Sequence, residues 1–123
     1  MRDRLERWIE AAVRFAERHP EAYRVTFGRE RSGAARHGPV VSESSRPTAR
    51  ELRRLQRAGR LPESLDVELA ARAYLAMETG MILWWLEDTG RADRAALVEI
   101  LVRLHPAASA RPRSGPHAAL TSP

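Results

Sequence analysis

One acidic residue, Glu78, interrupts the apolar run 73–86 within a helix-length segment at residues 66–88. Within the apolar run 73–86 of that segment, Glu78 and the adjacent Thr79 are the hydrogen-bonding side chains besides Tyr74 and the tryptophans. A carboxyl group buried beside a cavity can hold a cationic or hydrogen-bonding group of a ligand. The alternative is an ion pair between Glu78 and an arginine of the same chain or of a second subunit. Glu78 is therefore a candidate ligand-binding residue, with both roles open.

Large, adaptable side chains from several segments could line such a cavity. Met fills irregular gaps, and Tyr or Trp adds one hydrogen bond to a large apolar surface, so a mixed lining suits a small apolar or amphipathic ligand. Ordinary core packing explains the same residue types at helical spacing and is the alternative for each of them. Besides Glu78, the candidate ligand-binding residues are Trp8, Phe15, Tyr23, Phe27, Tyr74, Met77, Met81 and Trp84.

The residue types that most often carry catalysis or bind metals show no suitable pattern. Cysteine is absent, which excludes disulfides, thiolate zinc sites and a thiol nucleophile. The histidines share no metal-ligand spacing, and no Ser or Thr lies in a nucleophile motif. His19, on the apolar side of its helix before Pro20, is expected to be a packed or capping residue, with a place in the cavity as the alternative. We expect no enzyme activity, no cofactor and no metal site.

Five helices are expected to position these side chains, and no strand pattern appears. Apolar residues recur with helical period over 3–19, and Pro20 suits the first turn of a short helix that Gly28 ends. An arginine-rich helix covers 47–58, and Asp66 caps the helix 66–88. The last helix covers 93–105. Its apolar residues, spaced i, i+3, i+4 and i+7, are Leu97, Ile100, Leu101 and Leu104.

At 123 residues the chain is expected to form one all-α domain over 1–105. Residues 29–46 are rich in Gly, Ser, Arg and Pro without an apolar period, which predicts a flexible loop. Residues 106–123 contain few large apolar groups, which predicts a disordered tail.

The helix 66–88 is apolar on nearly every side, so it needs its own core on one face and another surface, most simply a second copy of the chain, on the other. At about 100° per residue two apolar arcs separate. The first holds Ala70, Ala73, Tyr74, Met77, Gly80, Met81 and Trp84. The second holds Ala71, Leu75, Ile82 and Leu86, and we favour it as the face toward the partner.

A transmembrane span is the rival interpretation of the same segment. A span needs about 20 predominantly apolar residues, whereas the run 73–86 is shorter and contains Glu78. The chain opens with Arg2, Asp3 and Arg4 and shows no apolar signal region. We expect no membrane association and a cytoplasmic location.

Charge is unevenly distributed along the chain. Lysine is absent; residues 46–60 hold six Arg against one acid, and residues 61–105 hold four Arg against eight acids. A basic helix beside an acidic half can be a nucleic-acid surface, a partner surface or two mutually attracting parts of one fold. For Arg50, Arg53, Arg54 and Arg57 we favour a solvated face or pairing with the acidic half over phosphate contacts.

The order of these segments resembles a known family. An apolar helix is followed by HPEAYRVTFG, a basic helix running into AGRL, then DVELAARAYLAMETGMILWWLED and a final Leu-rich helix. This order resembles the C-terminal regulatory domain of TetR-family transcriptional regulators, over about residues 5–105. The matching positions are His19, Pro20, Tyr23, Phe27, Ala58, Gly59, Arg60, Leu61, Asp66, Glu68, Leu69, Ala70, Ala71, Gly80 and Trp84.

The resemblance implies an effector-sensing domain that binds a small ligand between its helices. It also implies a homodimer in which the helices 66–88 and 93–105 form a four-helix bundle across a two-fold axis. Gly80 would mark a close approach of another helix or a ligand. The candidate dimerisation residues are Leu75, Gly80, Ile82, Leu86, Leu97, Ile100, Leu101 and Leu104.

The N-terminal helix-turn-helix of the family has no counterpart in the sequence, so DNA binding would need a domain that this chain does not contain. The expected function is effector sensing and dimerisation in a TetR-like regulator, of the repressor type. One alternative is a stand-alone helical module that heterodimerises with a regulator. Another is an Arg-rich helical protein that binds nucleic acid, which strongly salt-dependent binding would reveal.

Overall fold

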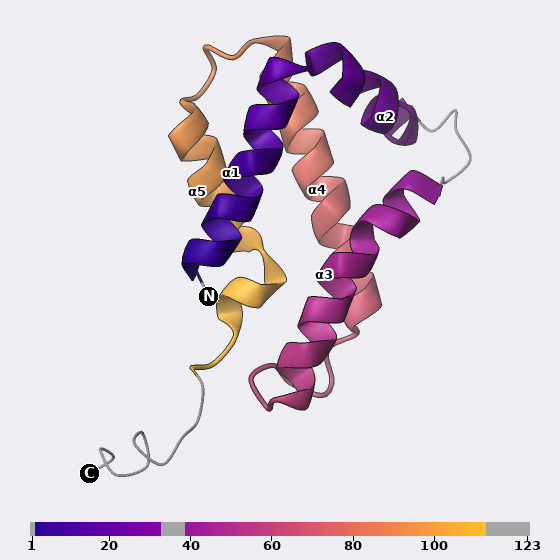
Figure 1. The fold of residues 1–123 in the computed structure, drawn as a ribbon, viewed down its shortest axis with the longest axis vertical. Helices are drawn as coiled ribbons and strands as arrows, with labels where there is room; N and C mark the ends of the chain where they lie inside the picture. The colour runs from indigo at the N-terminus through magenta and orange to yellow at the C-terminus, as the bar shows by residue number, and fades with distance from the viewer. Residues whose placement is uncertain (1, 33–38, 113–123) are drawn as a thin grey trace.

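Five α-helices and one short 3-10 helix make up residues 2–32 and 39–112, the part of the chain that this computed structural model describes (Figure 1). These residues contain no strand, which confirms the all-α fold class. The elements are α1 (Arg2–Arg18), α2 (Pro20–Ser32), α3 (Pro39–Arg57), α4 (Val67–Glu87), α5 (Arg94–Leu104) and η1 (Pro106–Ser109).

The helix ends lie where short-range chemistry places them. Asp66 is the N-cap of α4, and its side chain accepts a hydrogen bond of 3.1 Å from the backbone N–H of Leu69. Gly59 follows α3 with a φ of 74°, a backbone conformation that glycine adopts without steric cost. Pro20 opens α2, where its missing N–H would have had no intrahelical partner. The predicted bounds of α1, α4 and α5 therefore agree with the structure to within one or two residues.

The structure differs from the prediction in the loop over 29–46. Helix α2 continues past Gly28 to Ser32, and α3 begins at Pro39 with Pro47 inside it. Glycine weakens a helix by only about 1 kcal/mol, and one proline is tolerated where the neighbouring turns are packed, so neither residue had to end a helix. Residues 33–38 lie outside the described part.

The predicted tail over 106–123 also differs at its beginning. After α5 the chain forms η1, and the backbone N–H of Arg111 donates to the carbonyl of Arg60 at 2.8 Å. In return the Arg60 Nε donates to the carbonyl of Arg111 at 2.7 Å. Backbone hydrogen bonds and the buried Ala107 hold this segment, although it has no large apolar side chain. Residues 113–123 lie outside the described part.

Two apolar clusters form the interior. The main core joins α1, α2, α4 and α5, and the second core joins α3, the start of α4 and η1. The main core contains Leu5, Ile9, Val13, Ala16, Tyr23, Tyr74, Ile82, Leu83, Trp85, Leu86, Leu97, Val98, Leu101 and Val102. The second contains Ala49, Leu52, Leu55, Leu61, Val67, Ala71 and Ala107. Helix α4 contributes to both, so it is the central element of the fold.

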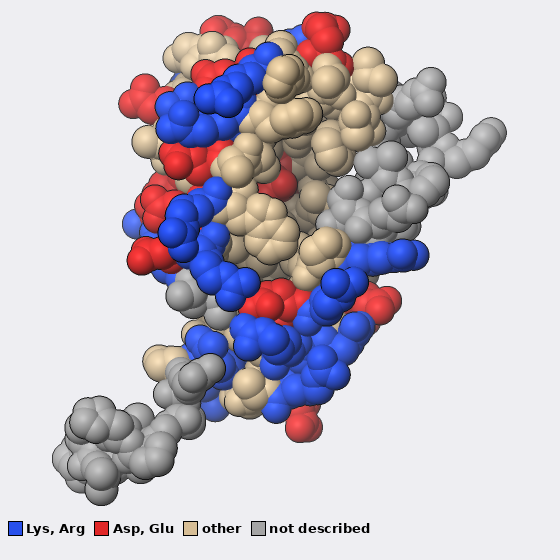
Figure 2. All heavy atoms as spheres, in the orientation of Figure 1, with Lys and Arg blue, Asp and Glu red and all other residues tan. Residues whose placement is uncertain are grey.

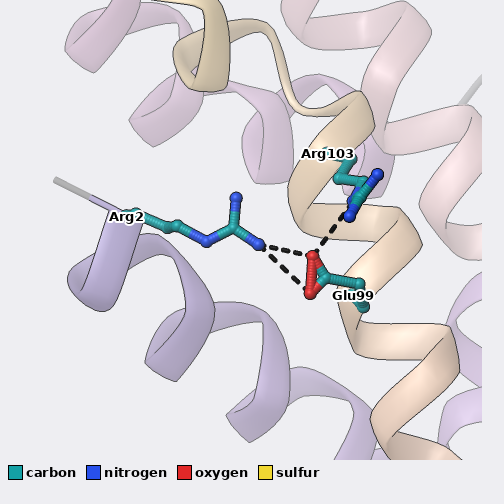
Figure 3. Close-up of polar contacts among 3 residues, drawn as sticks. All are labelled: Arg2, Glu99 and Arg103. Carbon is teal, nitrogen blue, oxygen red and sulfur yellow. Dashed lines mark hydrogen bonds and ion pairs between the residues drawn. The ribbon is translucent and has the colours of Figure 1, made fainter.

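Helices α1 and α5 pack against each other, with ion pairs at both ends of the contact. At one end Glu99 binds Arg2 of α1 and Arg103 of its own helix (Figure 3). At the other, Arg94 lies 2.6 Å from Glu17. These side chains are partly exposed, so solvent screens the pairs and each adds little to stability. Their main effect is on register, because they align α1 with α5 from one end to the other.

The arginine-rich helix α3 makes ion pairs with acidic residues. Arg54 lies 2.6 Å from Glu51 of the same helix, and Arg53 lies 3.0 Å from Glu68 of α4. Figure 2 shows arginines gathered over the lower half of α3, with acidic residues among them. Part of this basic surface thus attracts the acidic half of the fold, as expected from the charge distribution. None of the helices in the described part of the chain has the length and apolar character that crossing a membrane requires.

Candidate functional site

A pocket of about 90 Å³ opens between α1, α3 and α4. Its walls are mostly apolar, and a few polar groups converge on it from different elements. In Figure 2 acidic atoms are visible in the recessed surface between α1 and α3. The lining residues are Leu5, Trp8, Ile9, Ala12, Thr48, Tyr74, Leu75, Glu78 and His105.

Glu78 and Tyr74, one helical turn apart on α4, form a hydrogen-bonded pair inside the pocket. The Tyr74 hydroxyl lies 3.0 Å from the Glu78 Oε1 and 3.2 Å from the carbonyl oxygen of Leu101. A hydroxyl has one proton, so the Tyr74 hydroxyl either donates to one of these two acceptors at a time or shares its proton between them. Burial raises the pKa of Glu78, and the hydrogen bond from Tyr74 offsets only part of this effect. The predicted alternative of an Arg partner is not what the described residues show.

His105, which follows the end of α5, brings an imidazole ring to the pocket. Its ring packs on the ring of Tyr74 with centroids 4.4 Å apart, and its Nδ1 accepts a hydrogen bond of 3.0 Å from the backbone N–H of Ala107. Burial lowers the pKa of His105 to about 4, so the imidazole is neutral at physiological pH. With Nδ1 as acceptor, the neutral ring has its proton on Nε2 and can act as a donor there.

The acid sensitivity of folding offers a test of this buried histidine. In the folded chain the pKa of His105 lies below the ordinary histidine value of 6.5. The unfolded chain therefore binds the proton more tightly than the folded chain does. Folding stability is lost as the pH falls from about 6.5 to about 4. Replacing His105 with Asn removes this titration and keeps a side-chain acceptor at the N-cap. Between pH 7 and about 4.5, the variant should lose about 2–3 kcal/mol less stability than wild type in denaturant titrations.

Glu78 titrates in the opposite sense, because its raised folded pKa makes protonation stabilising. Glu78 is present in both the variant and the wild-type protein. The difference between their losses of stability on acidification therefore isolates the contribution of His105. An identical loss of stability in the two proteins would show that His105 is not buried as a neutral ring.

Three of the predicted ligand-binding residues, Trp8, Tyr74 and Glu78, line the pocket. Four others belong to or pack against the main core, as the core-packing alternative held: Tyr23, Phe27, Met77 and Met81. The remaining two, Phe15 and Trp84, are about half exposed and do not line the pocket. Phe15 lies against His19 with ring centroids 5.1 Å apart, and Trp84 lies under the Arg91 guanidinium at 4.9 Å.

Sequence reasoning missed six lining residues. Leu5, Ile9, Ala12, Thr48 and Leu75 share no pattern that separates pocket from core, because the crossing of three helices selects them. His105 did leave a signal. It stands between the last helix and Pro106, where a polar side chain serves as an N-cap for the next turn.

The predicted dimer residues divide into buried and accessible groups. The interior of the chain itself holds Ile82, Leu86, Leu97 and Leu101, and Leu75 lines the pocket. The preference for the arc of Leu75, Ile82 and Leu86 as the partner face is therefore corrected. A helical wheel separates two arcs without telling which one the rest of the chain covers.

Exposed apolar side chains lie on the outer faces of α4 and α5. Ile100 and Leu104, both predicted, are exposed, and Gly80 is half-buried. Leu69 and Trp84 are exposed on the same side of α4 as Gly80. A Cβ added at Gly80 would meet nothing within 4 Å in the chain, so its own fold does not require glycine there.

Residues 1–106 match the family model described as "Tetracyclin repressor-like, C-terminal domain". The match spans α1 to α5, with the pocket residues of all contributing elements. No curated protein and no solved structure matches the chain. The predicted resemblance is confirmed: the chain belongs to the family of tetracycline repressor-like C-terminal domains, the regulatory domains of transcriptional regulators.

Proposed function

We propose that the chain is the effector-sensing and dimerisation domain of a TetR-like transcriptional regulator of the repressor type. Its effector is a small apolar or amphipathic molecule that binds in the pocket between α1, α3 and α4. The observation that carries the proposal is the pocket itself, in which Tyr74, Glu78 and His105 meet within apolar walls. A few polar groups in an apolar concavity are typical of sites for small organic ligands. The volume of about 90 Å³ is smaller than that of most ligand pockets, so it limits the effector to a small molecule.

Helix α4 links ligand binding to dimerisation in this proposal. Tyr74, Leu75 and Glu78 lie on the pocket side of α4, whereas Leu69, Gly80 and Trp84 lie on its outer side. A ligand that favours one position of α4 changes the surface offered to a second subunit. Effector binding then shifts the population between two dimer arrangements.

Filling the pocket tests the effector role. Ala12 lines the pocket and Ala11, the preceding residue of α1, is exposed and lines none of its walls. We expect Ala12→Leu to fold, and to lose the rise in melting temperature that small apolar and amphipathic compounds produce in wild type. A ligand at one hundred times its Kd stabilises a protein by about 2.7 kcal/mol, which thermal shift assays detect readily.

Ala11→Leu is the matched control and should respond to the same compounds as wild type. If hits of the compound screen stabilised Ala12→Leu and wild type equally, the ligand would bind elsewhere and the pocket assignment would fail.

A further inference from the structure

The pocket holds an acidic side chain that pairs with no cation among the described residues. Glu78 is hydrogen-bonded to the Tyr74 hydroxyl, and neither a described arginine nor His105 forms an ion pair with it. His105 is close through its ring contact with Tyr74, but its Nδ1 is an acceptor occupied by the Ala107 N–H. A carboxyl group in such a position has its strongest possible partner still to gain, because an ionic hydrogen bond is about twice as strong as a neutral one.

The surroundings of Glu78 suit the apolar body of a small organic cation. Leu5, Ile9 and Leu75 provide aliphatic walls, and the half-exposed indole of Trp8 lies at the same opening. An indole face attracts an ammonium group, and its apolar surface accepts an aryl or alkyl group equally well.

We propose that the pocket binds a small organic monoamine in its ammonium form, with the ammonium group on the Glu78 carboxylate and the apolar body against Trp8 and Ile9. This inference rests on the proposed function, since it names the chemical class of the effector. The inference goes beyond the proposed function because it assigns a positive charge to the ligand and an ionised state to Glu78 in the complex.

Binding of such a cation must change the hydrogen bonds around Glu78. In the free protein the Tyr74 hydroxyl donates to the Glu78 carboxyl and also lies 3.2 Å from the carbonyl oxygen of Leu101, and burial favours the protonated form of Glu78 by raising its pKa. With the ammonium group bound, Glu78 is ionised and accepts from both the ligand and the Tyr74 hydroxyl. The proton of Glu78 leaves to solvent, so uptake of one cation releases up to one proton.

Few other groups near Glu78 can contribute to that proton release. Burial raises the pKa of the Tyr74 and Tyr23 hydroxyls, so both stay neutral. Burial lowers the pKa of His105 to about 4, so it is neutral as well. Arg4 and Glu51 line an adjoining pocket, and Glu51 stays ionised because the hydrogen bond from Arg54 lowers its pKa. Between about pH 5 and pH 8, released protons therefore report on Glu78.

Isothermal titration calorimetry with a charged and a neutral probe of the same shape tests the proposal. The probes are benzylammonium and benzyl alcohol, titrated at about pH 6 in two buffers of different ionisation enthalpy. Wild type should bind benzylammonium at least about tenfold more tightly than benzyl alcohol, and should release protons only with the cation.

Glu78→Gln is the informative variant, because its amide can still hydrogen-bond to the Tyr74 hydroxyl while it cannot become an anion. It should bind benzylammonium about tenfold or more weakly than wild type, without proton release, and bind benzyl alcohol unchanged. The control is Glu10→Gln on α1, which removes the same charge from a residue outside the pocket, and it should match wild type. The wild-type comparison of the two probes needs no variant, so it decides the matter even if Glu78→Gln does not fold.

Two outcomes would overturn the inference and separate it from the proposed function. If wild type bound benzyl alcohol as tightly as benzylammonium, the pocket would take neutral effectors and the charge assignment would fail; binding of the cation without proton release would overturn the change of protonation assigned to Glu78. If neither probe bound, the amine class would be wrong, and the Ala12→Leu comparison with other compounds would judge the effector proposal independently.

Discussion

Replacement of Trp85 by Ala is expected to lower the free energy of unfolding by about 3–5 kcal/mol, the largest loss of stability among single substitutions considered for this chain. The Trp85 side chain is 2% exposed in the main core, and its Nε1 donates to the carbonyl of Ala92 at 2.8 Å. Truncation leaves a large cavity and an unsatisfied carbonyl acceptor at the turn between α4 and α5. Both effects destabilise the folded chain.

The neighbouring tryptophan provides the control. Trp84 is 40% exposed and lies under Arg91, so Trp84→Ala removes less buried surface from the chain itself than Trp85→Ala does. Urea titrations at several protein concentrations should show a large loss for Trp85→Ala at every concentration. The loss for Trp84→Ala should be smaller in dilute solution and grow with protein concentration if Trp84 lies in a dimer interface. Equal losses for the two variants would contradict the burial described for them.

The second large effect concerns dimerisation. Trp84→Glu is expected to weaken the homodimer by about 30-fold or more, because tryptophans at the centre of an interface commonly contribute 2 kcal/mol or more, and a buried carboxylate adds a desolvation penalty. The side chain lies on the outer side of α4, on the exposed apolar surface to which Leu69 belongs. Ile100 and Leu104 make a similar exposed apolar surface on α5.

Sedimentation velocity over a range of concentrations measures this effect. Val25→Glu is the matched control, since Val25 is 68% exposed and belongs to α2 rather than to α4 or α5. Wild type and Val25→Glu should dimerise alike, and Trp84→Glu should sediment as a monomer at concentrations where they do not. A dimer unaffected by Trp84→Glu would place the interface elsewhere.

The sequence allowed the helices to be predicted where local chemistry decides their ends. Asp66 caps α4 and Pro20 opens α2, and both signals act within a single turn. The start of α3 could not be predicted in this way. A proline such as Pro47 usually marks a helix beginning, because its fixed φ and missing N–H suit the first turn, but here it lies inside α3, which begins at Pro39.

The candidate site was predictable in part for a related reason. Glu78 stood out because a polar residue in an apolar run needs an explanation, and the structure places it in the pocket. The membership of His105 and Thr48 depends on how α3 and the end of α5 cross α1, which no local pattern contains. The same limit applies to the two arcs of α4, since the covered arc is determined by long-range contacts of Ile82 and Leu86.

The walls of the pocket come from residues almost one hundred positions apart. Leu5 and Trp8 belong to the first helix, whereas His105 follows the last, and the pocket exists only while both are docked on α4. The contacts that build it join the two ends of the domain, so their loop-closure cost is large. A ligand in this pocket therefore slows the opening of α1 and α5 together, and its residence time is limited by how often these two ends of the domain separate.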